Sequence, residues 1–156
     1  MSVRCAIGLG ANLGARAETL EQACTELAAL PQTHVVARSR WIETEPVGGP
    51  SGQGRYLNGA VLIETELAPR ALLARLQAIE REHGRRREDE VRHGARTLDL
   101  DLLLYGDQEL DEPGLTIPHP RMEERLFVLE PLRELWPALI LPRAGIPIAE
   151  RIAALA

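Results

Sequence analysis

The chain has 156 residues, enough for one domain with a buried core, and its hydrophobic content of 45% argues against a disordered chain. Its formal net charge of −5 argues against a nucleic-acid-binding protein, because such proteins are usually basic. All 18 basic residues are arginine, which excludes chemistry that depends on a lysine nucleophile or Schiff base.

The two cysteines, Cys5 and Cys24, have neither the number nor the spacing of a metal site or a disulfide framework. We interpret both as small buried side chains in a reducing compartment. No leader with charged residues before an apolar stretch is evident, and no apolar run approaches the roughly 20 residues that cross a membrane. We therefore expect a cytoplasmic protein that does not enter the membrane.

The chain opens with an apolar stretch, residues 3–9, that predicts a strand. A tight turn is expected to follow it, built on Gly8, Gly10, Asn12 and Gly14. The glycine spacing of a dinucleotide-binding motif is absent. We interpret the turn as a place where backbone can approach a ligand.

The next segments predict a helix and two strands joined by a loop. Residues 16–30 have the apolar spacing of a helix that Pro31 ends, and residues 34–46 form a long strand region. Residues 47–55 are too rich in glycine for anything but a loop. In the following strand, 56–65, the amide of Asn58 needs a hydrogen-bond partner. That partner is either a cross-strand group or a flat polar ring of a ligand.

A second helix is predicted over residues 69–83, with Gly84 as its cap. Gln77 and Glu80 lie three residues apart on one side of it, at the spacing where side chains meet. They are either a solvated edge or a polar lip for a ligand. Residues 85–95 then form a charged connector whose only larger apolar side chain is a valine.

The most informative stretch is residues 96–106, an apolar strand that carries two acidic residues. Because alternate side chains of a strand share a face, Asp99 and Asp101 point the same way, about 6–7 Å apart along the chain. Leu103 and Tyr105 are expected to continue that face. Two converging carboxylates suit Mg²⁺, although alternating leucine and aspartate is also typical of a half-solvated edge strand.

Two observations favour the metal site over the edge strand. The strand continues into residues 102–104, which are apolar on both faces, so the acidic pair lies at the mouth of a buried strand. Guanidinium groups that can bind phosphate are concentrated just before it. The arginines concerned are Arg85, Arg86, Arg87, Arg92 and Arg96. Carboxylates for a cation beside arginines for phosphate are typical of a polyphosphate site.

The rest of the chain completes an α+β fold. Residues 107–114 predict a hairpin region, residues 122–135 a helical stretch and residues 146–155 a short amphipathic helix. The order strand, helix, strand, strand, helix, strand is that of a ferredoxin-like βαββαβ core. We expect one domain over residues 1–156, with an antiparallel sheet, two helices on one face and the C-terminal helices along the other.

Several segments resemble a known family. Residues 92–103, Arg-His-Gly-Ala-Arg-Thr-Leu-Asp-Leu-Asp-Leu-Leu, resemble the signature of 6-hydroxymethyl-7,8-dihydropterin pyrophosphokinase of folate biosynthesis. Further segments resemble the family in the same order, so the match covers nearly the whole chain. They are residues 8–14, 43–48, 56–58, 118–122 and 127–132.

The resemblance implies a reaction and its participants. The family transfers a pyrophosphoryl group from ATP to the hydroxymethyl oxygen of the dihydropterin and releases AMP. Two Mg²⁺ ions held by Asp99 and Asp101 are implied, with small-molecule substrates, no nucleic acid and no membrane. We expect a monomer.

The resemblance also implies roles for particular residues. The catalytic set is Arg85, Arg92, Arg96, Asp99 and Asp101. The set at ATP is Gln77, Glu80, Arg87, Leu102, Thr116, His119 and Arg125. The set at the pterin is Gly10, Thr44, Glu45, Pro46, Val47, Tyr56, Asn58, His93 and Phe127. Three positions depart from the family: His93 where tryptophan is common, Ala95 where proline is common, and Glu123 where histidine is frequent.

Two other functions are compatible with parts of the sequence. A Mg²⁺-dependent nucleotidyltransferase could use the same acidic pair and would release pyrophosphate in place of AMP. A ferredoxin-like module could bind RNA through its open sheet face, but aromatic residues make up only 3% of the chain. For the pyrophosphokinase, we hypothesise that residues 85–95 close over the phosphates when both substrates bind.

Overall fold

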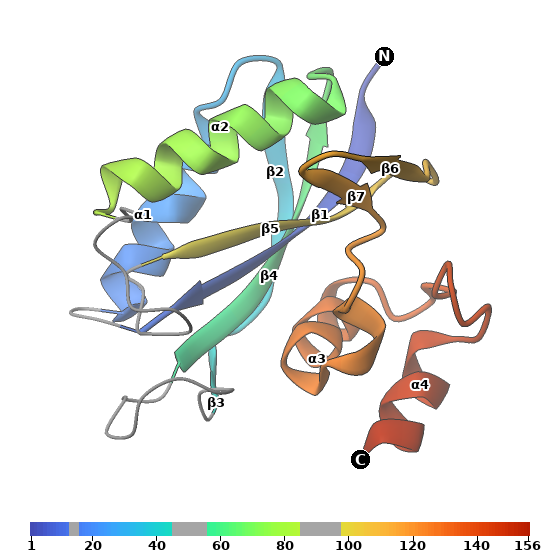
Figure 1. The fold of residues 1–156 in the computed structure, drawn as a ribbon. Coiled ribbons are helices and arrows are strands. Elements are labelled where there is room, and N and C mark those ends of the chain that lie inside the picture. Colours follow the sequence, from blue (N-terminus) through green and yellow to red (C-terminus); the bar gives the residue numbers. More distant parts are fainter. Residues whose placement is uncertain (13–15, 45–55, 85–97) are drawn as a thin grey trace.

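The structure, a computed structural model, describes residues 1–12, 16–44, 56–84 and 98–156 (Figure 1). Its elements, in chain order, are strands and helices followed by a hairpin and a helical C-terminal region. They are β1 Val3–Ala11, α1 Arg16–Ala28, β2 Thr33–Arg38, β3 Ile42–Thr44, β4 Tyr56–Thr65, α2 Pro69–Glu82, β5 Asp99–Tyr105, β6 Leu110–Glu112, β7 Leu115–Ile117, the 3₁₀ turn Met122–Glu124, α3 Leu126–Leu135 and α4 Ile148–Leu155.

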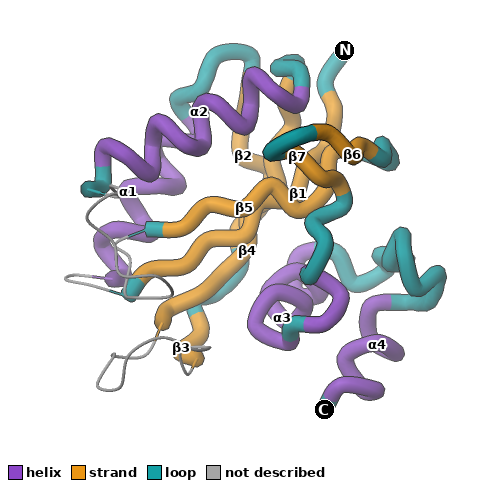
Figure 2. Tube along the Cα trace, in the orientation of Figure 1, coloured by secondary structure: helices purple, strands orange, loops and turns teal. Residues whose placement is uncertain are grey.

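The main sheet is antiparallel, with its strands in the order β2-β4-β1-β5, and β3 also pairs with β4. The first strand of the chain is therefore central, between β4 and β5 (Figure 2). This order and the helices between the strands confirm the ferredoxin-like α+β fold expected from the sequence. The predicted hairpin is also confirmed, because β6 pairs with β7.

The sheet separates two apolar layers. On one face, Leu20 of α1 and Leu72 of α2 pack with Ile7 of β1 in the larger buried cluster. On the other face, Leu129 of α3 and Ile148 of α4 belong to a second cluster, which includes buried residues of β1, β4 and β5. Figure 1 shows α1 and α2 together on one side of the sheet and α3 on the other. The expected placement of the helices is confirmed.

The expected strand over residues 34–46 is not continuous. Arg38 pairs with Val61 and Ile42 pairs with Asn58, so three residues of the β2–β3 link oppose two residues of β4. The Ser39 hydroxyl compensates for the interruption by accepting the Ala60 N–H at 2.9 Å. The interruption depends on how this link pairs with β4, so the apolar pattern of residues 34–46 could not predict it.

The expectation that Tyr105 continues the face of the two aspartates is wrong. Ile7 pairs with Leu102 and Ala6 with Leu104, which leaves Leu103 as the extra residue of a bulge. The bulge reverses the alternation, so Tyr105 packs in the cluster beneath α1 and α2. Its hydroxyl donates to the Leu67 carbonyl.

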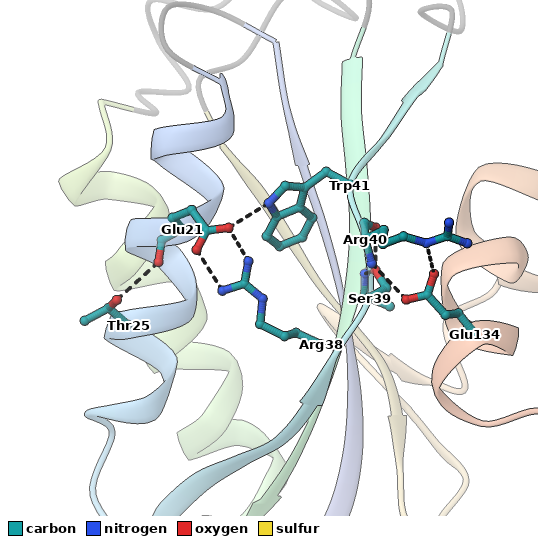
Figure 3. A network of polar contacts seen from close by, with 8 residues as sticks. Glu21, Thr25, Arg38, Ser39, Arg40, Trp41 and Glu134 are labelled. Carbon is teal, nitrogen blue, oxygen red and sulfur yellow. Dashed lines mark hydrogen bonds and ion pairs between the residues drawn. The ribbon is translucent and has the colours of Figure 1, made fainter.

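The β2–β3 link is fixed from both sides of the sheet. Toward α1, Glu21 accepts hydrogen bonds from the Arg38 guanidinium and, at 2.9 Å, from the Trp41 indole N–H. Toward α3, Glu134 accepts the Arg40 backbone N–H and side-chain N–H, each at 2.9 Å. Figure 3 shows the two carboxylates on opposite sides of this link. Both attachments hold the start of β3, which leads into the segment expected to bind the pterin.

Glu21 gives a prediction about pH. Hydrogen bonds lower the pKa of the Glu21 carboxyl group from 4.5 to about 2, with the largest effect from Arg38 and the next from Trp41. Because the folded pKa lies below the unfolded one, the stabilisation is present above pH 4.5 and is lost as the pH falls toward 2. The side chain is half exposed, so its effect on stability is small.

We expect the Arg38→Leu variant to raise the pKa of Glu21 more than the Trp41→Phe variant does. An NMR titration of the Glu21 side-chain carboxyl carbon in the three proteins measures this order. An unchanged titration midpoint in the Arg38→Leu protein would contradict the prediction. Near-UV circular dichroism at neutral pH is the control for an intact fold.

The cysteines are buried and free, as expected. Burial raises the pKa of Cys5 to about 12 and also raises the pKa of Cys24. Neither thiol is therefore a ready nucleophile near neutral pH. Within the described ranges, none of the helices is both long enough and apolar enough to span a membrane.

Candidate active site

The two aspartates lie on β5, opposite two glycines of β1. Asp99 pairs with Gly10 and Asp101 pairs with Gly8. Asp99 is half-buried and Asp101 is exposed, whereas the leucines that alternate with them are buried beneath α1 and α2. The predicted common face of the carboxylates is therefore confirmed, and it is the face opposite α1 and α2. Because the opposing residues are glycines, β1 contributes no side chain next to either carboxylate.

The sequence suggested that Gly8 and Gly10 belong to a turn. Both are instead part of β1, because the strand extends to Ala11. Gly10 pairs with Asn58 of β4 on its other side. A Cβ at Gly10 would lie only 2.9 Å from the Asn58 side-chain oxygen, so the amide occupies the space that glycine leaves. Asp99 and Asn58 thus flank the same glycine from the two neighbouring strands.

Asn58 is almost fully buried, and its amide nitrogen donates to the Thr44 hydroxyl of β3. Of the two alternatives for this amide, a cross-strand hydrogen bond is therefore present in the structure. The bond involves two residues that the resemblance assigns to the pterin. It fixes the side-chain oxygen of Asn58 toward β1, at the centre of the sheet.

The aromatic side chains that the resemblance assigns to the pterin belong to two elements. Tyr56 lies two residues before Asn58 on β4 and is half-buried. Phe127 lies in the first turn of α3, the helix that packs on β4. The Arg125 guanidinium lies 5.6 Å from the centre of the Phe127 ring, within cation–π range. The fold therefore packs α3, with Phe127 in its first turn, on β4, the strand that carries Tyr56 and Asn58.

His119 is fixed beside the acidic strand. Its backbone N–H donates to the Leu103 carbonyl at 3.0 Å, a group at the bulge of β5. Its ring Nδ1 accepts the Arg121 backbone N–H at 3.3 Å. Burial lowers the pKa of His119 below 6.5, although Asp101 opposes that shift. The neutral ring with Nδ1 as acceptor carries its proton on Nε2, which is then a hydrogen-bond donor without a positive charge.

Two of the residues that the resemblance assigns to ATP lie on α2, and one of them reaches β5. Glu80 is buried, and its carboxylate accepts the Leu100 backbone N–H at 2.8 Å. The alternative that Glu80 forms a solvated edge is therefore wrong. Gln77 lies one turn earlier and is half-buried. Leu102 is buried on the α2 side, so any contact between this residue and a nucleotide would be made by its backbone.

Of the remaining residues assigned by the resemblance, one lies on the hairpin and the others lie outside the described ranges. Thr116 is half-buried on β7, the strand of the hairpin that lies closest to β5. A further eight assigned residues, and the hypothesis of a closing connector, lie outside the described ranges. They are Glu45, Pro46, Val47, Arg85, Arg87, Arg92, His93 and Arg96.

Glu123 has a role that the sequence did not indicate. Its buried carboxylate accepts the backbone N–H groups of Arg143 and Ala144 at 2.9 and 2.8 Å. The Arg143 guanidinium in turn donates to the Pro118 carbonyl at 2.7 Å. These contacts attach the segment before α4 to the residue that precedes His119. The periodicity of the sequence could not predict this attachment, because Glu123 and the groups that it binds lie 20 and 21 residues apart.

The donor set for a metal ion is small. Among the described residues, no three or more of His, Cys, Asp and Glu are grouped so that they could hold a metal ion. Asp99 and Asp101 offer two hard oxygen donors on one face, which is enough for Mg²⁺ when phosphate and water complete its shell. The described residues therefore fit a cation that binds together with a nucleotide.

Comparison with known proteins decides the family. Residues 6–137 match the family of 7,8-dihydro-6-hydroxymethylpterin-pyrophosphokinase (HPPK). The chain belongs to the HPPK family. HPPK is an ATP-dependent enzyme of folate biosynthesis, and the activity of this chain is pyrophosphoryl transfer from ATP to hydroxymethyldihydropterin.

Two bacterial relatives support the assignment over most of their length. The 2-amino-4-hydroxy-6-hydroxymethyldihydropteridine pyrophosphokinase of Pseudomonas aeruginosa is 46% identical over 142 residues, which cover 91% of this chain and 86% of that protein. The enzyme of the same name from Bacillus subtilis is 47% identical over 129 residues, covering 83% of this chain and 75% of that protein.

Solved structures support the HPPK fold. The structure of Plasmodium falciparum HPPK-DHPS superposes with a TM-score of 0.75 over 99% of this chain, at 13% sequence identity. This chain spans only 41% of that longer protein. At such low identity the match concerns the fold alone.

Proposed function

We propose that HPPK catalysis in this chain takes place on the sheet face that carries Asp99 and Asn58, with one substrate on each side of Gly10. The observation that carries this proposal is the pairing of Gly10 with Asp99 on one strand and with Asn58 on the other. MgATP would bind toward β5, and the dihydropterin would bind toward β4 and β3. The reacting phosphorus and the hydroxymethyl oxygen would then meet over β1.

In the proposed reaction, the hydroxymethyl oxygen forms a bond to the β-phosphorus of ATP. The bond from that phosphorus to the oxygen of the α-phosphate breaks, and AMP leaves with that oxygen. The hydroxyl proton is released to water. Such a transfer requires positioning and charge stabilisation more than covalent catalysis by the protein.

We propose that Asp99 and Asp101 hold Mg²⁺, two ions by the resemblance to the family. Bound there, the ions would supply positive charge to the phosphate oxygens and a template for the polyphosphate. The chain's own contribution is the spacing of the two carboxylates, which the strand sets, opposite glycines that place no side chain of β1 beside them. Carboxylates at alternate positions of one strand remain aligned without a long loop to order.

For the nucleotide, His119 is proposed to donate from Nε2 to a phosphate oxygen. The contact between Nδ1 and the Arg121 N–H supports this role, since it leaves the proton on the ring nitrogen that faces away from that bond. A neutral donor beside Asp101 avoids a competing ion pair with the carboxylate. The other proposed nucleotide residues are Gln77, Arg85, Arg87, Arg92, Arg96, Leu102, Thr116 and Arg125.

For the pterin, the proposed contacts combine an amide with aromatic rings. A pterin has an edge of alternating donors and acceptors, which the Asn58 amide and neighbouring backbone can match. Tyr56 and Phe127 would pack against its ring. The other proposed pterin residues are Gly10, Thr44, Glu45, Pro46, Val47 and His93. Because Asn58 already has Thr44 as a partner, its side chain is oriented before the substrate arrives.

A product assay tests the activity against both alternatives. With ATP labelled in the adenosine moiety and the hydroxymethyl dihydropterin, we expect AMP to appear in step with the pyrophosphorylated pterin. Release of pyrophosphate with an adenylylated product would indicate a nucleotidyltransferase instead. A titration with single-stranded RNA at physiological salt is the matching test of the binding module, and tight binding there would favour that function.

We further propose that the chain acts as a monomer in the cytoplasm. That compartment supplies ATP and keeps thiols such as Cys5 and Cys24 reduced. The substrates are both small molecules, and the residues proposed for them all belong to one chain.

A further inference from the structure

The acidic strand lies at the edge of the sheet. In the order β2-β4-β1-β5, only one side of β5 pairs with another strand of the main sheet among the described residues. In an antiparallel pair, the N–H groups of successive residues point alternately toward the partner strand and away from it. Since the Leu100 N–H points to Glu80 on α2, those of Asp99 and Asp101 point toward β1. The backbone of the acidic pair is thus held from both sides.

Glu80 is an unusual residue for its position. Only 6% of it is exposed, on a helix whose other buried residues are Leu72, Leu76 and Ile79. Burying a carboxylate costs free energy unless hydrogen bonds compensate, so packing alone would favour another apolar residue here. Its oxygen instead lies 2.8 Å from the nitrogen of the one residue between the two aspartates.

We propose that Glu80 is a positioning residue for the metal site, and that it acts through the Leu100 backbone to keep the Asp99 and Asp101 carboxylates convergent. The proposal rests on the assignment of those aspartates to the metal. Without the Glu80 acceptor, the peptide between the two aspartates could rotate and separate their side chains. Groups that hydrogen-bond to a metal's ligands or fix their backbone set the affinity of the site as well as its geometry.

This role differs from the direct contact with ATP that the family resemblance implies for Glu80. A direct contact contributes to nucleotide affinity with or without a metal ion. A positioning role changes only the part of the nucleotide affinity that depends on Mg²⁺. Binding of a non-hydrolysable ATP analogue, measured across a Mg²⁺ series and in EDTA, separates the two roles without any turnover.

The test compares Glu80→Leu, which removes the acceptor, with Glu80→Gln, which keeps an acceptor oxygen on a side chain of equal length. We expect Glu80→Leu to raise the Mg²⁺ concentration for half-maximal analogue binding by roughly 10- to 100-fold. Glu80→Gln should stay within a few-fold of the parent, and analogue affinity in EDTA should be unchanged in both variants. The matched control is Glu82→Leu at the exposed end of the same helix, which should behave as the parent.

A second readout needs neither metal nor nucleotide. Hydrogen exchange of the Leu100 amide, followed by NMR in the free protein, should be slow in the parent and in Glu80→Gln and faster in Glu80→Leu. If Glu80→Leu does not fold, Glu80→Asp replaces it, because the shorter side chain withdraws the acceptor while keeping the charge. Thermal unfolding and pterin binding report whether each variant is folded.

The outcomes are distinguishable. Parent-like Mg²⁺ dependence in a folded variant that has lost protection at Leu100 would overturn the positioning role. An equal loss of affinity with Mg²⁺ and in EDTA would also overturn it and would indicate direct contact with the nucleotide. If Asp101→Asn itself leaves the Mg²⁺ dependence intact, the assignment of the aspartates fails, which is a separate result.

Discussion

Replacing Asp101 with asparagine is expected to reduce turnover by roughly 100- to 10,000-fold. The amide has no negative charge for a cation, and stabilising charge through a metal ion is worth several kcal/mol at the transition state. Each 1.4 kcal/mol or so corresponds to a tenfold change in rate. The side chain is exposed on β5, so the substitution leaves the apolar layers of the fold undisturbed.

The measurement is kcat with saturating substrates, together with binding of the ATP analogue at several Mg²⁺ concentrations. Asp107→Asn is the matched control, because Asp107 is also exposed and lies in the turn after β5, beyond the proposed site. We expect the control to retain parent activity and the Asp101 variant to bind the analogue almost independently of Mg²⁺. Near-normal turnover in the Asp101 variant would refute its role as a metal ligand.

Replacing Asn58 with alanine is expected to weaken pterin binding by about 1–3 kcal/mol, because a buried group of the ring loses its hydrogen-bond partner. This is roughly a 5- to 150-fold increase in the dissociation constant. The loss also removes the partner of the Thr44 hydroxyl and the group that lies against Gly10. The expected loss of affinity therefore combines a missing contact to the pterin with a disturbed orientation of Thr44.

Calorimetry of the variant with the dihydropterin measures this effect. Binding of MgATP alone serves as the internal control, because Asp99 and Asp101, the proposed metal ligands, lie on β5 across β1 from Asn58. If the variant binds the pterin as tightly as the parent does, Asn58 is a structural residue that acts through its bond to Thr44. Weakened binding of both ligands would instead indicate general damage to the sheet.

Much of the fold and part of the site could be predicted from local patterns. The period of two along β5 placed Asp99 and Asp101 on one face, and the period of the apolar residues on α2 marked its buried side. These patterns are reliable because each depends only on the geometry of a single element. The same reasoning gave the order of strands and helices, and hence the ferredoxin-like sheet.

The features that the sequence did not reveal depend on contacts between elements. The bulge at Leu103 arises from the pairing of β5 with β1, so the alternation that predicted the side of Tyr105 failed beyond it. Gly8 and Gly10 suggested a turn, because glycine is common in turns and uncommon in strands. Their function in the strand becomes visible only when Asn58 and the aspartates are seen opposite them.

The role of Glu80 was ambiguous for the same reason. Its spacing from Gln77 placed both on one side of α2, but it could not show whether that side faces water or the edge of β5. The answer depends on the docking of the helix, which the larger apolar cluster determines. A buried acidic residue in a helix is thus recognised only after the layers of the fold are known.

If the two substrates meet over Gly10, a metal ion held by the aspartates lies next to the bound pterin. Mn²⁺ in place of Mg²⁺, with a non-hydrolysable ATP analogue and the dihydropterin, permits this measurement by paramagnetic relaxation of the pterin's hydroxymethyl protons. We predict strong relaxation in the parent protein and little in Asp101→Asn at the same ligand occupancy. Equal relaxation in the two proteins, or none in the parent with both ligands bound, would contradict a single site arranged around Gly10.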